Sequence, residues 1–473
     1  MTAFGSGPGR PSKHAKPQQG LFRLPARLGR IVRALRWIPA ALLLLASASG
    51  AAGDRPNLVL IVSDDQDYEQ LGFMGHAQVH TPSLDALARA GSVFPVAHVT
   101  MSRCRPTLAG LLDGRFPHQN GIFYNRGERN LSPEQALPRL LRDAGYATFQ
   151  GGKFWEGDPR DFGFTDVGED ADAFVRESQA SLARFLEANA GKRPMFIWWA
   201  PKIPHLPHDP PKRFLDTIEE ASIPVPAWVA SRRAEEFRER EHLSLAMVEW
   251  LDAGVGELVD GLRGAGVLDS TLCLFLIDNG YANGLVSKGS PAEKGVRTPL
   301  VFTWPGHIAA GKRLDALVST VDVYPTLLDY AGLAIPPGVA GVSLRPLLEG
   351  GHEMPRTCLY GAIYPPEPEL GITPAKAALA LYARDEAWKY VLHLQDVSKV
   401  EQGRFTAFAA TRVVPWQRGQ EELFDLRADP HELADLSGDP AQLERRERMR
   451  AEVLAWWRDT GGAELDVPAP LSR

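Results

Sequence analysis

The stretch SRCRPTLAGLLDGR, residues 102–115, is the one around which the rest of the chain is arranged. A lone cysteine, Cys104, stands just ahead of Pro106, and a proline followed by an apolar run is typical of the first turn of a helix. Cys104 is therefore predicted to lie at a helix N-terminus, where free N–H groups and the helix dipole lower the pKa of a thiol and attract anions. A buried cysteine beside a helix cap is the alternative.

The N-terminal segment is first basic and then apolar. Eight Lys and Arg residues precede the apolar run 37–45, no acidic residue occurs before Asp54, and Ala46-Ser47-Ala48 has the form of a cleavage site. This pattern predicts a signal peptide over residues 1–48, because the apolar run is shorter than the roughly 20 residues that a membrane span needs. An uncleaved signal anchor is the alternative. We expect a secreted or periplasmic protein with no stable membrane span after signal cleavage.

Charge and cysteine content argue against a nucleic-acid-binding protein and against a protein held together by disulfides. Without the eight positive charges of the leader, the formal net charge of −6 becomes −14. Nucleic acid is then not an expected partner, because no basic stripe is available to neutralise phosphates. The three cysteines, Cys104, Cys273 and Cys358, do not make a disulfide framework.

Apolar runs alternate with helical patterns along the chain. Four runs rich in β-branched and aliphatic residues are typical of strands buried on both faces: 57–63, 145–150, 195–200 and 270–277. Segments with helical spacing lie between them: 83–90, 171–190 and, as two helices, 235–263. This alternation predicts an α/β sheet that is covered by helices on both faces.

Polar residues stand where these strands end. Asp64-Asp65, Lys153, His205 and Asp278-Asn279 each follow one strand, and open α/β sheets bind ligands beyond the carboxyl ends of their strands. Two adjacent carboxylates repel each other, and a divalent cation with oxygen ligands would compensate them. The alternatives are a helix cap or a polar loop for the aspartates, and a solvated or capping side chain for a single Lys or His.

Taken in order, these motifs resemble the sulfatase family of the alkaline-phosphatase superfamily. The matching segments cover nearly the whole mature chain: 64–65, 81–88, 104–115, 152–153, 204–207, 278–280, 288–289, 297–299, 304–306, 322–326, 422–426 and 429–430. The resemblance implies an alkaline-phosphatase-like central mixed sheet flanked by helices, with a catalytic domain over 54–350. A smaller C-terminal α+β subdomain is expected over 351–463.

The C-terminal subdomain is also indicated by the residues themselves. Short strands are predicted at 377–383, 388–394 and 422–426, as a small antiparallel sheet. A helix is predicted from Asp439-Pro440 to about Asp459.

The resemblance implies a formylglycine enzyme that cleaves a carbohydrate or small-molecule sulfate ester. In the family a formylglycine-generating enzyme oxidises the signature cysteine, here Cys104, to an aldehyde. Its hydrate is a diol, of which one hydroxyl attacks sulfur and the other, once deprotonated, expels the sulfate. In the family the diol lies beside one bound Ca²⁺ or Mg²⁺, because the ligands of the ion are hard oxygens. The ligands that the resemblance implies in this chain are Asp64, Asp65, Asp278, Asn279 and the modified Cys104.

The resemblance also assigns the remaining catalytic side chains. Lys153 and Lys288 would bind the sulfate oxygens, and His205 would protonate the departing alcohol.

Two positions depart from the family pattern. Leu108 replaces the signature arginine, and Trp155 replaces the histidine that acts as the base on the second hydroxyl. Leucine cannot donate a hydrogen bond and an indole is not a base at neutral pH. We hypothesise that Arg103 or Arg105 supplies the missing charge and that His208 or another histidine supplies the base. The alternative is that these are solvated surface residues.

The departures keep two other functions open. The same metal site could cleave phosphate or phosphonate esters, whose tetrahedral anions have a similar shape. A sulfatase-like protein could instead bind sulfated glycans without turnover. The particular sulfate ester is set by loop contacts, which the sequence does not reveal.

Overall fold

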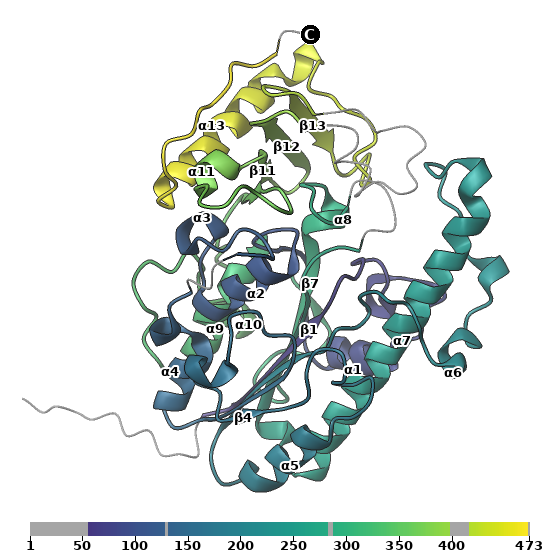
Figure 1. The fold of residues 1–473 in the computed structure, drawn as a ribbon, viewed down its shortest axis with the longest axis vertical. Coiled ribbons are helices and arrows are strands. Elements are labelled where there is room, and N and C mark those ends of the chain that lie inside the picture. The colour runs from purple at the N-terminus through teal and green to yellow at the C-terminus, as the bar shows by residue number, and fades with distance from the viewer. Residues whose placement is uncertain (1–54, 128–130, 282–286, 398–415, 472–473) are drawn as a thin grey trace, which may run out of the picture. The chain divides into compact units, whose positions relative to one another are not determined.

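The computed structural model describes residues 55–127, 131–281, 287–397 and 416–471, which Figure 1 shows as a ribbon. The predicted signal peptide over residues 1–48 lies outside these ranges. Within them, no helix combines the length and the apolar character that crossing a bilayer requires.

A nine-stranded mixed sheet is the centre of the fold. Its strand order is β4-β3-β5-β1-β6-β7-β2-β8, with β9 paired to β2. Neighbours from β3 to β6 are parallel, whereas β7 runs antiparallel to both β6 and β2. The predicted mixed α/β sheet is thus confirmed. The strands are β1 (Asn57–Ser63), β2 (Ser92–His98), β3 (Ala147–Gly152), β4 (Asp166–Val167), β5 (Met195–Ala200), β6 (Thr271–Ile277), β7 (Arg297–Thr303), β8 (Lys312–Arg313) and β9 (Val318–Ser319).

Helices cover both faces of this sheet (Figure 1). Alternate residues of β1 point to opposite faces: Leu58 and Leu60 belong to a core with α2, α4 and α9, while Val59 and Ile61 belong to a core with α1, α5 and α7. The helices of this part of the chain are α1 (Pro82–Ala90), α2 (Cys104–Asp113), α3 (Pro117–Asn120), α4 (Leu137–Asp143), α5 (Ala180–Asn189), α6 (Lys212–Leu215), α7 (Ala234–Gly264), α8 (Glu293–Val296), α9 (Val323–Tyr330) and α10 (Arg345–Leu348).

Two of the helix predictions are wrong in extent. Of the segment 171–190, only α5 is helical; the residues before it form turns. The segment 235–263 is one helix, α7, and not two. Its glycines do not interrupt it but allow close packing, since a Cβ at Gly254 would lie 2.6 Å from Val175 and one at Gly256 would lie 2.9 Å from Ser83.

The register of β1 and β6 sets the position of the candidate site. Ser63 pairs with Ile277, and the N–H of Asp278 donates a hydrogen bond to the Ser63 carbonyl over 2.9 Å. All seven residues of each strand are buried, as their continuous apolar runs predict. The residues that follow the two strands, Asp64 and Asp278, therefore meet at one edge of the sheet.

A second sheet forms the C-terminal part of the fold. It has four antiparallel strands, and α13 packs on it through Met449, Val453 and Trp457. This confirms the predicted small sheet and helix, although the first predicted strand begins three residues late because 374–377 are helical. The elements are β10 (Leu359–Ile363), α11 (Pro374–Ala377), β11 (Ala380–Arg384), β12 (Trp388–His393), β13 (Glu421–Asp425) and α13 (Leu443–Asp459). The boundary between residues 350 and 351 stays a prediction.

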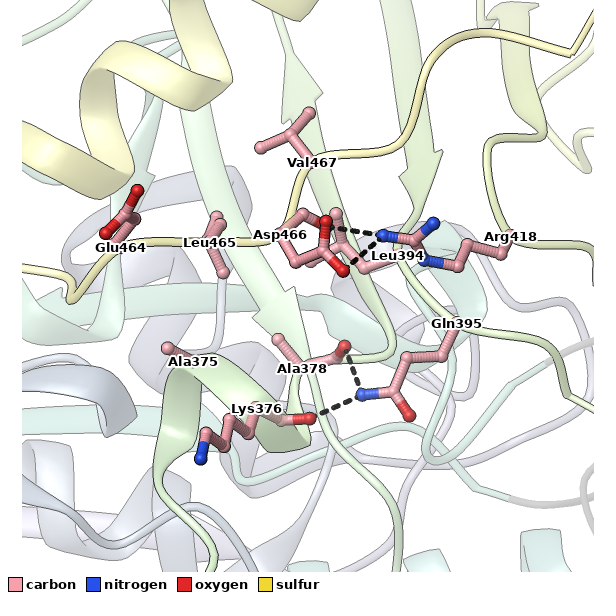
Figure 2. A pocket seen from close by; sticks show the side chains of 10 residues that line it. All are labelled: Ala375, Lys376, Ala378, Leu394, Gln395, Arg418, Glu464, Leu465, Asp466 and Val467. Atoms are coloured by element: carbon pink, nitrogen blue, oxygen red, sulfur yellow. Dashed lines mark hydrogen bonds and ion pairs between the residues drawn. The ribbon is translucent and has the colours of Figure 1, made fainter.

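The second sheet borders a cavity of about 760 Å³ (Figure 2). Arg418 and Asp466, which both line it, form an ion pair at 2.7 Å. Gln395 donates hydrogen bonds to the carbonyls of Lys376 and Ala378, at 2.6 and 3.0 Å. These polar groups on the cavity wall are thus paired within the protein.

A buried ionic network joins the two sheets. Glu293 on α8 accepts a hydrogen bond from Lys389 on β12 at 2.9 Å and lies 3.0 Å from His98 Nε2 at the end of β2. Glu432 lies 3.5 Å from Lys389 and accepts from the Glu293 N–H at 2.7 Å. The four side chains are at most 4% exposed. Removing one member of such a network leaves a buried charge without compensation.

Candidate active site

Cys104 lies at the N-terminus of α2, as the sequence predicts. The helix begins at Cys104 itself, because Arg103 has an extended backbone with φ −157° and ψ 148°. Every residue of α2 is buried, and Cys104 is 2% exposed.

The thiol of Cys104 is not activated by this position. Burial raises its pKa beyond its usual range, and the opposing effect of Lys153 and Lys288 does not compensate. The predicted lowering of this pKa is therefore wrong for the unmodified side chain. Desolvation outweighs a helix dipole that contributes only about 0.3–1 kcal/mol. A thiol that keeps its proton is a poor nucleophile.

Three carboxylates converge on this thiol. One ligand atom from each of Asp64, Asp65, Cys104 and Asp278 lies within 4.8 Å of the others, and all four residues are buried. The Cys104 Sγ is 3.6 Å from Asp64 Oδ1 and 3.7 Å from Asp65 Oδ1. Asn279 joins the cluster, since its Nδ2 donates to Asp65 Oδ1 at 2.6 Å. The structure thus brings all five predicted metal ligands together.

The predicted cationic side chains border the same cluster. Lys153 Nζ lies 2.6 Å from Asp64 Oδ1 and 3.4 Å from Asp278 Oδ2. Lys288 Nζ contacts Asp65 Oδ1 and lies 3.5 Å from Cys104 Sγ.

His205 closes the cluster on its solvent side. Its Nε2 lies 3.4 Å from Asp65 Oδ2, and its side chain is 29% exposed, compared with 8% for Lys153. Its Nδ1 lies 2.7 Å from the Leu206 carbonyl, which can only accept, so Nδ1 carries a proton and Nε2 faces the cluster. All four predicted catalytic residues therefore lie at one place.

The carboxylates of the cluster differ in acidity. Burial raises the pKa of Asp65, but Lys288, His205 and Lys153 outweigh burial and bring it to about 2. Burial and the charge of Asp64 raise the pKa of Asp278 to about 8. The two lysines therefore do not suffice to keep Asp278 ionised at pH 7, and a further positive charge at this place would favour its ionised form.

Two oxygen atoms of the cluster lack partners. Asp64 Oδ2 and Asn279 Oδ1 are buried and accept no hydrogen bond from any residue that the structure describes. An unsatisfied buried polar atom costs about 1–3 kcal/mol. Unpaired oxygens beside a carboxyl that needs a further positive charge to ionise fit a hard cation such as Ca²⁺ or Mg²⁺.

Ser102 links the segment that carries Cys104 to the segment that carries Lys288, and the sequence does not predict this contact. Its Oγ accepts a hydrogen bond from the Gly289 N–H at 2.8 Å and donates to the Gly295 carbonyl at 2.8 Å. A serine two residues before a cysteine carries no sequence signal of its own, because its partners are 187 and 193 residues away.

Comparisons with known proteins agree with this arrangement. The family model described as Sulfatase matches residues 56–333, which is more than half of the chain. The chain belongs to the sulfatase family. A second model, the C-terminal domain of N-sulphoglucosamine sulphohydrolase, matches residues 283–402.

Relatives of this sulfatase include enzymes named for sulfated sugars. N-acetylgalactosamine-6-sulfatase of Homo sapiens is 29% identical over 405 residues, covering 70% of this chain and 74% of that protein. The ulvan-active sulfatase of Formosa agariphila is 26% identical over 449 residues, covering 87% of this chain and 82% of that protein.

Solved structures share the fold of this sulfatase. BT4656 in complex with D-glucosamine-2-N,6-O-disulfate has a TM-score of 0.69 at 20% identity, covering 86% of this chain and 98% of that chain. The phosphonate monoester hydrolase of Agrobacterium radiobacter also has a TM-score of 0.69 at 20% identity, covering 89% and 100% of the two chains.

The two departures of this sulfatase from the family pattern have different surroundings. Leu108 is 3% exposed and belongs to the core between α2 and the sheet. Trp155 lies beside the cluster, with its ring centre 5.8 Å from Lys153 Nζ. Its Nε1 is buried and has no hydrogen-bond partner within the described ranges. Trp155 therefore contacts the Lys153 ammonium through its ring and offers no base.

Of the two arginines in our hypothesis, Arg105 is neutralised. Its guanidinium forms a bidentate pair with Glu156, at 2.8 and 2.9 Å, and both side chains are buried. Arg103 is also buried, and burial lowers its pKa while Cys104, Asp65 and Glu367 raise it. Arg103 therefore stays the candidate for the charge that Leu108 does not supply.

His208 is a weak candidate for the base. Burial, together with Arg240 and His205, lowers its pKa to about 4, so the imidazole is neutral at pH 7 but has little affinity for a proton. Its ring contacts that of Tyr281, with centroids 5.1 Å apart. The role of His208 stays a prediction.

The Arg105–Glu156 pair ties the start of α2 to the segment that carries Lys153. Replacing Glu156 with alanine is expected to lower the free energy of unfolding by about 3–5 kcal/mol, because the buried Arg105 loses its carboxylate partner. Urea unfolding measures this. In the double variant Arg105→Leu and Glu156→Leu, most of the loss should be recovered. A single variant as stable as the wild type would contradict the expectation.

Proposed function

We propose that this sulfatase hydrolyses a sulfate ester of a carbohydrate or another small alcohol, through a formylglycine made from Cys104 beside a bound Ca²⁺. The observation that carries the proposal is the convergence of Asp64, Asp65 and Asp278 on Cys104, within 4.8 Å. The names of the relatives favour a sulfated sugar as the substrate.

Four residues would hold the cation. The unpaired oxygens of Asp64 and Asn279 and the raised pKa of Asp278 support a positive charge among them and Asp65. The oxygen donors suit Ca²⁺, and Mg²⁺ fits the same chemistry. When bound, the ion would lower the pKa of a hydroxyl at position 104 and polarise the sulfate oxygens.

Conversion of Cys104 by a formylglycine-generating enzyme would complete this set of donors. The protonated thiol is a soft, weak ligand, and an oxygen at this position would match its neighbours. A hydrated aldehyde there would supply the hydroxyl that attacks sulfur.

The remaining residues bind the substrate and transfer a proton. Lys153 and Lys288 would hold the negative sulfate oxygens, since both ammonium groups border Cys104 or its neighbouring carboxylates. His205 would donate a proton from Nε2 to the leaving alcohol, because Nε2 faces the cluster and the side chain lies on the solvent side.

The experiment that tests this proposal begins with the mass of the tryptic peptide that contains Cys104, from protein made in its native host. An aldehyde in place of the thiol is the expected result. Turnover of 4-nitrophenyl sulfate should then exceed that of 4-nitrophenyl phosphate and of a phosphonate monoester. An unmodified thiol with no turnover would favour a protein that binds sulfated glycans, as Leu108 and Trp155 allow. Preference for the phosphorus esters would favour the other enzyme class.

We also propose that the protein is exported and is secreted or periplasmic. The basic and apolar pattern of residues 1–48 supports this proposal.

A further inference from the structure

The connection between β4 and α5 contains one strained residue. Val175 has φ 70°, and a β-branched residue seldom adopts this left-handed conformation because its Cβ crowds the backbone. Such a conformation costs free energy and persists only where the surrounding structure enforces it, and residues of this kind cluster at functional sites. The strain at Val175 sets the direction in which the side chain of the next residue, Arg176, leaves the turn.

Helix α7 holds this turn in place. Gly254 leaves room for Val175, since a Cβ at Gly254 would lie 2.6 Å from Val175 Cγ1. Gln179, just past the turn, donates to the Gly254 carbonyl at 3.2 Å. Trp250 lies one helical turn earlier on the same face of α7, and the Arg176 guanidinium lies over its ring, with Cζ 5.3 Å from the centroid. Arg176 is therefore fixed against a long helix.

Arg176 reaches from this turn to the segment that carries His205. Its Nη1 forms an ion pair with Asp209 Oδ1 at 2.5 Å, and its Nη2 donates to the Pro207 carbonyl at 3.1 Å. The Arg176 side chain is 11% exposed, whereas that of Asp209 is 58% exposed. An ion pair with so exposed a partner adds little to stability. A planar guanidinium that binds two acceptors does, however, fix their relative positions.

A second set of contacts joins the same two segments. The Lys202 N–H donates to the Ala171 carbonyl at 3.2 Å, and Lys202 Nζ lies 2.6 Å from Asp172 Oδ1. The segment that carries His205 is therefore bound to residues 171–176 both before and after the histidine.

The contact at Pro207 affects the orientation of the imidazole. His205 Nδ1 lies 2.7 Å from the Leu206 carbonyl, and Nε2 faces the cluster, 3.4 Å from Asp65 Oδ2. The carbonyl that Arg176 binds belongs to the next residue, Pro207. Because the two carbonyls are consecutive in the backbone, a shift of the Pro207 carbonyl would also move the one that orients His205.

We propose that Arg176 is a positioning residue, which holds the segment 205–209 so that His205 can deliver a proton to the departing alcohol. The proposal rests on the proposed function for its reaction. In it, Arg176 acts only through His205 and makes no contact with the ester.

The experiment compares two aryl sulfates that differ in their need for an acid. 4-Nitrophenol leaves readily as its anion, whereas phenol is a poor leaving group that gains from protonation. Arg176→Met should therefore lower kcat/KM for phenyl sulfate at least about tenfold more than kcat/KM for 4-nitrophenyl sulfate. Asp209→Asn changes an exposed side chain, so the fold is kept, and the same difference between the esters should be at least about threefold.

Two further variants distinguish positioning from a general effect on structure. Arg345→Met is the matched control and should leave kcat/KM for both esters within about twofold. Arg345 also pairs with a carboxylate, that of Asp329 at 3.3 Å, and lies over a ring, that of Tyr330 at 5.1 Å. In the His205→Gln background, Arg176→Met should cause no further loss with phenyl sulfate, because a residue that acts through another has no effect once that other is removed.

Three kinetic results would overturn the proposal. In the first, Arg176→Met affects the two esters alike; in the second, its effect multiplies with that of His205→Gln; in the third, Asp209→Asn keeps the wild-type ratio of the two esters.

The ¹H–¹⁵N spectrum of the histidine rings distinguishes failure of this proposal from failure of the proposed function. The Nδ1–H resonance of His205, identified by its loss in His205→Gln, should shift or disappear in Arg176→Met. If it does so in a protein that turns over neither ester, the positioning role stands and the proposed reaction fails. If the resonance is unchanged while the wild type turns over both esters, the positioning role fails alone.

Discussion

Replacing Cys104 with alanine should reduce kcat/KM for 4-nitrophenyl sulfate at least about 10³-fold, because the variant has no side chain that can become the nucleophile. The surrounding residues cannot take over the attack. Lys153 and Lys288 are held as cations by the carboxylates, which raise the pKa of both ammonium groups against burial. The loss should appear in kcat, since Cys104 is not proposed to bind the ground-state ester.

The other two cysteines provide matched controls. Cys273 lies within β6 and Cys358 within the core of the second sheet, and both are free and buried, as Cys104 is. Alanine at either position should leave kcat/KM within about twofold, at some cost in stability. If Cys104→Ala keeps wild-type turnover while its Tm is unchanged, the proposed nucleophile is wrong.

Removing divalent cations should abolish turnover and lower the Tm, and added Ca²⁺ should restore both. A ligand that binds only the folded state stabilises it by about 2.7 kcal/mol at a concentration of 100 times its Kd. The cation would satisfy the unpaired oxygens of Asp64 and Asn279 and offset the repulsion among the carboxylates. The measurement is thermal unfolding and aryl sulfate turnover after EDTA and again after Ca²⁺. An unchanged Tm after chelation would contradict the proposed site.

The effect of Ca²⁺ on stability should grow from pH 5 to pH 8. Without a cation, the pKa of Asp278 is about 8, above its usual value of 3.8. A carboxyl whose pKa is raised by folding contributes its full stability below pH 3.8 and loses it as the pH rises to about 8. The pKa of Asp65 is lowered to about 2, so its contribution is lost only in acid, outside this window. The cation-free protein should therefore lose stability toward pH 8, where the ion binds best.

Asp113 provides the control for this pH dependence. Burial raises its pKa to about 7, but it lies at the end of α2, away from the cluster. Asp113→Asn should make stability less dependent on pH while leaving the response to Ca²⁺ unchanged. Asp278→Asn should weaken both the pH dependence of stability and the response to Ca²⁺. If the two variants respond to Ca²⁺ alike, Asp278 is not a ligand.

The sequence predicts the strands that carry the centre, and the reason is physical. β1, β5 and β6 are buried on both faces, so their apolar runs are unbroken and the polar residues that follow them stand out. The prediction misses β2 and β7 because each contains a proline, Pro95 and Pro299, which weakens the strand pattern. A bulge between Phe94 and Ala97 accommodates Pro95.

Properties that depend on burial could not be predicted from the sequence. The raised pKa of Cys104 follows from desolvation by neighbours that the fold assembles, and the position of Cys104 at a helix N-terminus suggests the opposite sign. The pairing of Arg105 with Glu156 joins residues 51 positions apart that carry no shared pattern. A cavity of about 240 Å³ near the proposed cation site is lined by residues as far apart in the sequence as Asp67 and His431, and no local motif brings these residues together.

The buried network around Glu293 limits how this fold can be recombined. Lys389 on β12 supplies the ammonium that faces Glu293, and Glu293 stands five residues after Lys288 on the same connection from β6 to β7. A hybrid that takes its second sheet from a relative would need a cation at the position of Lys389. Without one, Glu293 would lose its buried partner, and Lys288, which is proposed to bind the sulfate, would be displaced by a change made in the other sheet.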